Sequence, residues 1–227
     1  MPSNTILFII HQNFMPFRNK HQLFFTILTG FFVTNAVVAE LIGGKLIQIG
    51  PFVLSIGIVL WPVVFVTTDL INEFYGKQNV QKLSYLTAAL IAYSFIVLMA
   101  AIQLPAVSFS PVTYEQFKAV FGQSQLIIVG SIIAFLVSQL VDSGLFHFLK
   151  QQTGERMIWL RSTGSTVISQ FIDTFIVAGI AFWLPGKVTF YQYVSMSITG
   201  YTAKLIIAVL MTPVIYALHA FLHKQLK

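Results

Sequence analysis

The chain has 227 residues, of which 56% are hydrophobic and only 9% are charged, and its mean hydropathy is +0.81. A soluble domain carries about 25% charged residues, so this composition excludes a water-soluble globule and indicates a protein that is embedded in lipid. The formal net charge of +6 is spread as single basic residues at the edges of apolar runs, which argues against nucleic-acid binding. Cysteine is absent, so disulfides and thiol chemistry are excluded.

Residues 1–20 are expected to form a cytoplasmic tail, because their apolar piece (6–10) is too short for the core of a signal peptide. About 20 apolar residues cross the hydrocarbon core of a bilayer as a helix. Several runs of the chain have that length and predict an all-α, polytopic bundle of six transmembrane helices, in one membrane domain that covers 1–227. The predicted spans are 23–42, 51–74, 83–104, 126–149, 165–184 and 197–222.

The connections between these spans are short except for 105–124, which is rich in proline and serine and is expected to be a longer external loop. Pro62 and Pro213 fall inside the second and sixth predicted spans. A proline frees a backbone carbonyl, which can kink a helix and line a cavity, but most such prolines only shape the packing, and that is the interpretation we favour here.

Lysine and arginine favour the cytoplasmic flanks of transmembrane helices, so their distribution predicts the orientation of the bundle. One set of flanks holds nine of these residues and the opposite set holds Lys45, Lys118 and Lys187, which predicts that both termini are cytoplasmic. The nine residues are Arg18, Lys20, Lys77, Lys82, Lys150, Arg156, Arg161, Lys224 and Lys227.

Four ionisable residues lie deep inside predicted spans: Asp69, Asp142, Asp173 and Lys204. An ionisable side chain near the bilayer centre costs about 2.5–3.5 kcal/mol on insertion scales, whereas an interhelical hydrogen bond returns only about 0.6 kcal/mol. These residues are therefore expected to face a shared interior with a function. Glu40 and Glu73 lie nearer the span ends, where snorkelling to water is the alternative interpretation.

Polar neighbours at helical spacing support this interior. Ser138 and Gln139 share a face with Asp142, and Thr166, Ser169 and Gln170 share one with Asp173. The segments SQLVDS (138–143) and SQFIDT (169–174) are nearly the same, which leaves both an internal duplication and a chance match of short strings open.

Several enzyme signatures are missing from the sequence. It contains no GxxxxGK[ST] phosphate-binding loop, no HExxH motif and no GxSxG nucleophile elbow. We therefore expect that the chain is not an enzyme and that it has neither a cofactor nor a metal site.

Longer motifs carry a family resemblance. The stretches WPVVFVTTDLINEFYGK (61–77), SQLVDSGLFHFLK (138–150), 159–182 and 201–216 resemble the queuosine precursor transporter family, also called the vitamin uptake transporter family. The likeness runs from the first span to the sixth and includes each of the deep polar residues. The first span departs from the family pattern at Glu40 and at the glycine pair before Lys45.

The resemblance implies import of 7-cyano-7-deazaguanine or 7-aminomethyl-7-deazaguanine, in the tRNA modification pathway, across the bacterial inner membrane. A carboxylate accepts two adjacent N–H groups of a purine-like edge, amides serve the ring polar atoms, and aromatic faces cover the flat base. Either Asp142 or Asp173 is expected to hold the base edge. The candidate substrate-binding residues are Asp142, Asp173, Gln139, Gln170, Asn35, Trp61, Lys204 and Thr174. The candidate gating or coupling residues are Asp69, Glu73 and Arg161.

Other functions stay open at this point. The chain has the length of a substrate-binding component of energy-coupling-factor transporters, which need ATPase partners, and its cargo is also open to another vitamin or nucleobase. A membrane enzyme or an assembly factor is a further alternative. The sequence does not fix the coupling ion or the oligomeric state, and a homodimer is the assembly that we consider.

Overall fold

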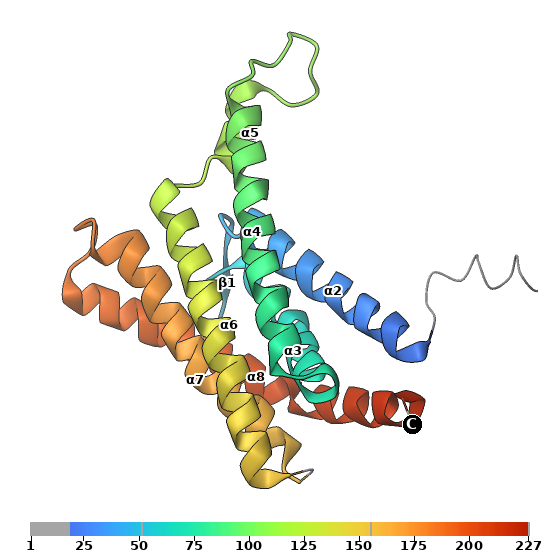
Figure 1. The fold of residues 1–227 in the computed structure, drawn as a ribbon. Coiled ribbons are helices and arrows are strands. Elements are labelled where there is room, and N and C mark those ends of the chain that lie inside the picture. The colour runs from blue at the N-terminus through green and yellow to red at the C-terminus, as the bar shows by residue number, and fades with distance from the viewer. Residues whose placement is uncertain (1–18, 51, 155, 227) are drawn as a thin grey trace, which may run out of the picture.

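The computed structural model describes residues 19–50, 52–154 and 156–226, so most of the predicted tail (1–20) lies outside the described residues. The described chain is helical apart from one short hairpin (Figure 1). Its elements are α2 (Lys20–Ile42), β1 (Leu46–Ile49), β2 (Phe52–Ser55), the 3₁₀ turn η1 (Ile56–Val59), α3 (Trp61–Tyr75), α4 (Lys77–Ile102), α5 (Tyr114–Phe121), α6 (Gln125–Thr153), α7 (Ile158–Ala178), the π-helical turn η2 (Gly179–Trp183) and α8 (Phe190–Leu226).

Five segments of the described chain are long and apolar enough to cross a membrane. This confirms the prediction of a helical protein with several membrane spans. These segments are Lys20–Ile42, Lys77–Ile102, Tyr114–Thr153, Ile158–Trp183 and Phe190–Leu226.

The predicted second span (51–74) differs from the structure. Residues 52–55 pair with β1 as an antiparallel hairpin, in which Leu46 lies opposite Ser55, and the helix begins only at Trp61. Pro62 occupies the first turn of α3, where its missing N–H costs no helical hydrogen bond. Pro62 therefore lies at the start of a helix and does not interrupt one, unlike the prediction that placed it inside a second span of 51–74.

The predicted external loop (105–124) contains a helix of its own. Thr113 caps α5 by accepting a hydrogen bond from the backbone N–H of Gln116, whose side chain accepts one from the backbone N–H of Thr113. This reciprocal pair is a capping box, which stabilises the first turn of a helix. α5 lies in the upper part of Figure 1, beside the C-terminal end of α4.

α3 is the central helix of the bundle. It packs against α2, α4, α6 and α8, and every residue from Val64 to Asn72 is buried. The most extensive helix pair is α6 with α7, and α8 crosses α7 and α3 (Figure 1). Gly76 alone separates α3 from α4, with φ 86° and ψ 162°, a conformation that glycine adopts without a steric penalty. This sharp turn lets α4 pack back against α3.

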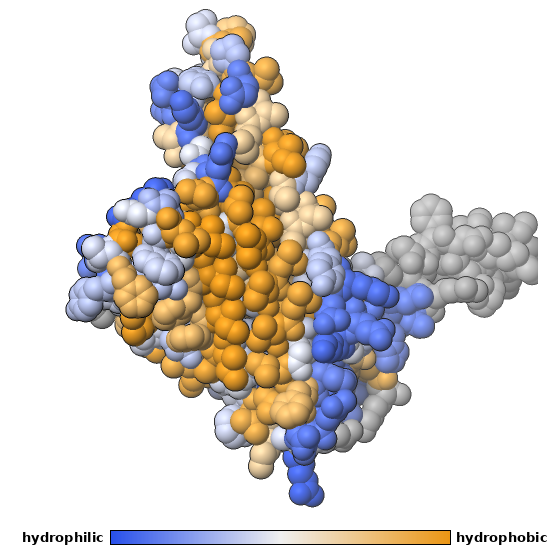
Figure 2. All heavy atoms as spheres, turned by 60° about the vertical axis from the view of Figure 1, so that its left-hand side comes forward, coloured by the Kyte–Doolittle hydropathy of each residue, from blue (hydrophilic) through white to orange (hydrophobic). Residues whose placement is uncertain are grey.

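The outer surface of the bundle is apolar. Figure 2 shows a broad hydrophobic face across the middle of the molecule, with hydrophilic residues gathered toward its ends. Exposed apolar side chains on α4 and α8 contribute to the surface; they include Leu86, Ile96, Val97, Ile206, Val209 and Leu210. Such a surface suits contact with acyl chains and not with water.

Several segments with predicted cytoplasmic flanks meet at one end of the bundle. Tyr75 donates a hydrogen bond to the backbone carbonyl of His21, and Phe24 packs edge-on against Phe221. The α3–α4 turn, the α6–α7 turn and the C-terminal part of α8 lie in the lower part of Figure 1. The basic flanks of the first, second, fourth and sixth predicted spans therefore share one end of the molecule.

Candidate functional site

Asp142 lies in α6 and is 6% exposed, in the interface with α7. Its Oδ1 accepts hydrogen bonds from the hydroxyls of Ser169, at 3.0 Å, and Thr166, at 3.4 Å. It has no ion-pair partner among the described residues. A buried carboxylate is thus held by neutral hydroxyls alone, which are weaker partners than a cation.

Asp173 lies in α7 and has a charged partner. Its Oδ2 is 2.6 Å from Nζ of Lys204 in α8, and its Oδ1 accepts a hydrogen bond from the Ser138 hydroxyl at 3.4 Å. The two side chains of the ion pair are 9% and 18% exposed. Lys204 therefore balances the charge of Asp173 inside the bundle.

Glu40, near the C-terminal end of α2, faces the same interior. Its carboxylate lies beside Ser131 and within electrostatic range of Asp173 and Lys204. The snorkelling interpretation of this residue is therefore not the arrangement found, because Glu40 turns toward polar groups of α6, α7 and α8.

The amides of the predicted site lie at different depths of the polar interior. Gln139 is 3% exposed, and its Oε1 accepts a hydrogen bond from the Thr68 hydroxyl of α3 at 3.4 Å. Gln170 is 5% exposed, one helical turn before Thr174, whose hydroxyl donates to the Gln170 backbone carbonyl. Gln139 thus links α6 to α3, whereas the hydroxyl of Thr174 satisfies a carbonyl of its own helix.

Asn35 and Trp61 lie outside this hydrogen-bonded group. Asn35 is half-buried, and its amide donates to the Phe31 carbonyl of its own helix at 2.8 Å. Trp61 stacks on Phe65 with 6.0 Å between ring centroids and also contacts Phe135. The structure therefore does not bring these two predicted residues into contact with the buried carboxylates.

Asp69 lies in α3 and is 3% exposed. Its Oδ2 accepts a short hydrogen bond from the Ser162 hydroxyl of α7, and its Oδ1 has no hydrogen-bond partner among the described residues. Asp142 is close enough to Asp69 for their charges to interact. The two aspartates therefore lie in one polar region between α3, α6 and α7.

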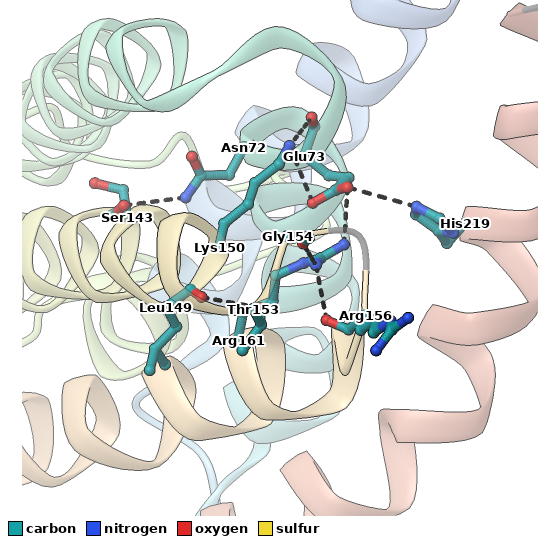
Figure 3. Close-up of polar contacts among 10 residues, drawn as sticks. All are labelled: Asn72, Glu73, Ser143, Leu149, Lys150, Thr153, Gly154, Arg156, Arg161 and His219. Carbon is teal, nitrogen blue, oxygen red and sulfur yellow. Dashed lines mark hydrogen bonds and ion pairs between the residues drawn. The ribbon is translucent and has the colours of Figure 1, made fainter.

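Glu73 lies one turn after Asp69 and gathers basic side chains from three helices (Figure 3). Its Oε1 is 2.9 Å from Arg161 Nη2 in α7 and 3.6 Å from His219 Nε2 in α8, and its Oε2 is 3.3 Å from Lys150 Nζ in α6. Lys150 also donates to the Glu73 backbone carbonyl at 2.7 Å. We call Glu73, Lys150, Arg161 and His219 the inner cluster.

Arg161 is the largest fully buried side chain of the described residues. Besides Glu73, its guanidinium donates to the carbonyls of Gly154, at 2.7 Å, and Arg156, at 3.3 Å, in the α6–α7 turn. It also lies 5.9 Å from the centre of the Phe146 ring. One side chain thus ties this turn to α3, as Figure 3 shows.

The polar interior contains a small cavity at Asp69. This cavity lies beside Asp69, Ser162 and Thr166 and has room for about one water molecule. A flat bicyclic base does not fit there without a separation of the helices. Among the described residues, no group of three or more His, Cys, Asp or Glu side chains is arranged to hold a metal ion.

Sequence reasoning missed several members of this region. Lys150 was assigned only to the basic flanks, yet it approaches Glu73, and so does His219. Asn72 donates to the Ser143 carbonyl at 3.1 Å and was not singled out. The signal that could have found Asn72 is its spacing, because Thr68, Asp69 and Asn72 share one face of α3.

A family comparison decides the class of the protein. The family described as "Putative vitamin uptake transporter" matches residues 55–218, which is most of the chain. The chain belongs to this transporter family. The match covers α3, α6 and α7 and most of α8, and so includes all three buried aspartates and Glu73, Lys150 and Arg161 of the inner cluster. His219 lies one residue beyond its end.

Two relatives of this chain are named as transporters. A protein of Bacillus subtilis (strain 168), "Probable queuosine precursor transporter", is 28% identical over 185 residues, or 80% of this chain and 78% of the relative. A Haemophilus influenzae (strain ATCC 51907 / DSM 11121 / KW20 / Rd) protein of the same name is 25% identical over 133 residues, or 56% and 51% of the two chains. No solved structure matches this chain. Both names describe transporters and not enzymes.

Proposed function

We propose that this chain imports queuosine precursors, 7-cyano-7-deazaguanine or 7-aminomethyl-7-deazaguanine, across the bacterial inner membrane. Membership of the transporter family and the names of the two relatives support the class of cargo. The observation that carries the proposal is Asp142, a buried carboxylate whose hydrogen-bond partners, Ser169 and Thr166, are neutral hydroxyls on a neighbouring helix.

Asp142 is better suited than Asp173 to hold the base. A guanine-like edge offers two adjacent N–H donors to one carboxylate. At Asp142 these donors replace two hydroxyl hydrogen bonds, whereas at Asp173 they compete with the ammonium of Lys204 at 2.6 Å. The exchange at Asp142 costs less because no buried ion pair is broken.

Gln139 extends this edge-reading site. It precedes Asp142 by three residues on α6, so both side chains share one helix face. Its amide N–H groups can donate to the ring carbonyl, and its Oε1 accepts only a long 3.4 Å hydrogen bond from Thr68, which is readily exchanged. Gln170 and Asp173 with Lys204 would border the base from α7 and α8.

The small size of the cavity at Asp69 fits a carrier that alternates between conformations. Because the cavity holds about one water molecule, a base enters only when α3 and α8 separate from the α6–α7 pair. The inner cluster links α3, α6, α7 and α8 near one end of the bundle, so we assign it as the inner gate, with Arg161 as its central residue.

We also propose six crossings with cytoplasmic termini. α3 has 15 residues, or about 22 Å, so it needs the preceding hairpin to complete a crossing. Leu54 of the hairpin and Ile58 of η1 are buried against Ala203 of α8, which suits irregular backbone at membrane depth. The chain lacks cysteine, so single cysteines at Lys82 and Lys187 report the topology without background. Labelling of both cysteines from the same side of the membrane would contradict the proposed topology.

Binding and uptake by purified protein test the cargo. We expect 7-cyano-7-deazaguanine to bind both wild-type protein and the Glu115→Gln control, because Glu115 is exposed on α5. Asp142→Asn should weaken this binding at least about tenfold, which is the loss typical of a charged hydrogen bond. Near-normal binding and uptake by Asp142→Asn at equal expression would refute the assignment. Uptake into liposomes that contain this chain alone would exclude a need for an ATPase partner.

A further inference from the structure

Asp69 has an oxygen atom without a partner. The residue is 3% exposed, and its Oδ1 makes no hydrogen bond among the described residues, while Oδ2 accepts from Ser162. A buried acceptor that loses its water without gaining a donor is costly, and a carboxylate oxygen more so. An unfilled oxygen of this kind indicates that something else completes the site.

The small cavity of the polar interior adjoins this residue. Asp69, Ser162 and Thr166 line its polar side, and Ala208, Met211 and Ile215 of α8 close it with apolar side chains. The hydroxyl of Ser162 donates its proton to Asp69, and that of Thr166 donates to Asp142. With their protons engaged, both hydroxyls have lone pairs left to offer. The cavity therefore adjoins oxygen acceptors, and its size suits one small cation.

The charges around Asp69 leave it uncompensated. Asp142 on α6 and Glu73 on α3 repel it, and Arg161 on α7 attracts it. The Arg161 guanidinium, however, already serves Glu73 and two backbone carbonyls. The residues of α8 that line the cavity are apolar. Two buried carboxylates in one region without an ion-pair partner favour uptake of a positive charge.

We propose that Asp69, Ser162 and Thr166 form a binding site for a monovalent cation, taken up as H⁺ or Na⁺. As a proton it would bond to Asp69 Oδ1, and as Na⁺ it would take that oxygen and the two hydroxyl oxygens as ligands. Intramembrane carboxylates commonly mark ion and proton pathways. This part of the inference does not depend on the identity of the cargo.

The cation site is coupled to Asp142. With Asp69 charged and empty, the two carboxylates compete for one proton, and a protonated Asp142 loses its capacity to accept two N–H donors. A cation at Asp69 removes the competition and keeps Asp142 ionised for the base. Cation and base therefore strengthen each other's binding, a coupling that rests on the proposed function.

Thermal stability of purified protein tests the cation site without any substrate. Wild-type protein is titrated with Na⁺ against N-methyl-D-glucamine at several pH values, beside Asp69→Asn and the Glu115→Gln control. A Na⁺ site gives a rise in Tm with Na⁺ in wild type and control that is absent in Asp69→Asn. A proton site gives such a rise on acidification, independent of Na⁺ and again absent in Asp69→Asn. Identical responses of Asp69→Asn and wild type to both cations would overturn the proposal.

Ser162→Ala is the second variant, since it retains the carboxylate and removes one oxygen beside the cavity. For Na⁺ the midpoint should shift to at least several-fold higher concentration, because one ligand oxygen is lost. For H⁺ it should shift to higher pH, because the Ser162 hydroxyl favours the charged form of the carboxylate to which it donates. An unchanged midpoint would count against the site even if Asp69→Asn did not fold.

The coupling is tested by the Kd of 7-cyano-7-deazaguanine. The stabilising cation should lower it about tenfold in wild type and leave it unchanged in Asp69→Asn. Binding of the base that is insensitive to both cations would refute the coupling and leave the transport proposal intact. Cation stabilisation through Asp69 without any binding of the base would refute the cargo and leave the cation site intact.

Discussion

The inner cluster and the Asp69–Asp142 region are neighbours in the same bundle but are built differently. Glu73 lies one turn from Asp69 on α3 and receives Lys150, Arg161 and His219 from three other helices. Asp69 and Asp142 receive hydroxyl groups from α7 and no ion pair among the described residues. One region is charge-compensated, and the other is not.

The difference shows how a membrane bundle separates residues that hold its helices together, here called fastening residues, from residues that bind a ligand. Ion pairs that are desolvated and geometrically fixed are costly to break on one side only, so the inner cluster resists opening until its partners move together. Hydroxyl donors are neutral and rotate, so their hydrogen bonds can be exchanged for those of a ligand at little cost. The residues that hold the structure closed and those that take a guest therefore differ in the charge of their partners.

The largest expected effect follows from removal of the Arg161 guanidinium. Arg161→Met leaves Glu73 with less compensation and removes the donor of two backbone carbonyls in the α6–α7 turn, so we expect a loss of about 3–5 kcal/mol of unfolding free energy in detergent. The matched control is Arg156→Met, whose residue is exposed in the same turn. Equal denaturation midpoints for the two variants would contradict a fastening role for Arg161.

Variants of the Asp173–Lys204 ion pair test whether charge compensation accounts for the contribution of a buried charge to stability. Asp173→Asn or Lys204→Met alone strands one buried charge and should cost about 2–3 kcal/mol, because the pair is not fully excluded from water. The double variant should recover much of this loss. A double variant less stable than both single variants would show that the pair contributes more than mutual neutralisation.

Asp142→Asn should have a smaller effect on stability than either change. The amide oxygen still accepts from Ser169 and Thr166, and one unbalanced negative charge disappears, so the unfolding free energy should change by about 1 kcal/mol or less. The Tm of this variant beside Asp173→Asn measures the contrast. A loss as large as that of Asp173→Asn would place Asp142 among the fastening residues.

The sequence predicted most helices and the buried aspartates, because both follow from the cost of polarity in lipid. Long apolar runs locate α2, α4, α6, α7 and α8. Spacing within a helix placed the hydroxyls of Thr166 and Ser169 on the face of Asp173, but in the structure both donate across the helix interface to Asp142. The same reasoning failed for 51–74, where hydropathy is high but the chain folds into β2 and η1 before α3. Part of the apolar character there serves packing inside the bundle, since Leu54 and Ile58 are buried against Ala203 of α8.

The partners of Glu73 could not be read from the sequence in the same way. Lys150 and His219 lie at span ends, where basic and aromatic residues are usual at a membrane interface. Which of them turns inward depends on how α6 and α8 cross α3, and this is a property of tertiary packing. Hydropathy gives the depth of a charged residue in the membrane, but not whether its side chain at a helix end points into the bundle or toward water.

The smallest expected effect belongs to His219 and tests how the inner cluster is shared. His219 is 3.6 Å from Glu73 and stacks on Phe74, but its side chain is 25% exposed, and Arg161 and Lys150 are closer to the same carboxylate. His219→Gln should therefore change the unfolding free energy by about 0.5 kcal/mol or less, as does His147→Gln, which removes a contact with exposed Gln151. If His219→Gln lowered the unfolding free energy nearly as much as Arg161→Met, the contact of α8 with Glu73 would hold the helices together as strongly as that of α7. Opening of the gate would then require α8 to leave Glu73, and not only α7.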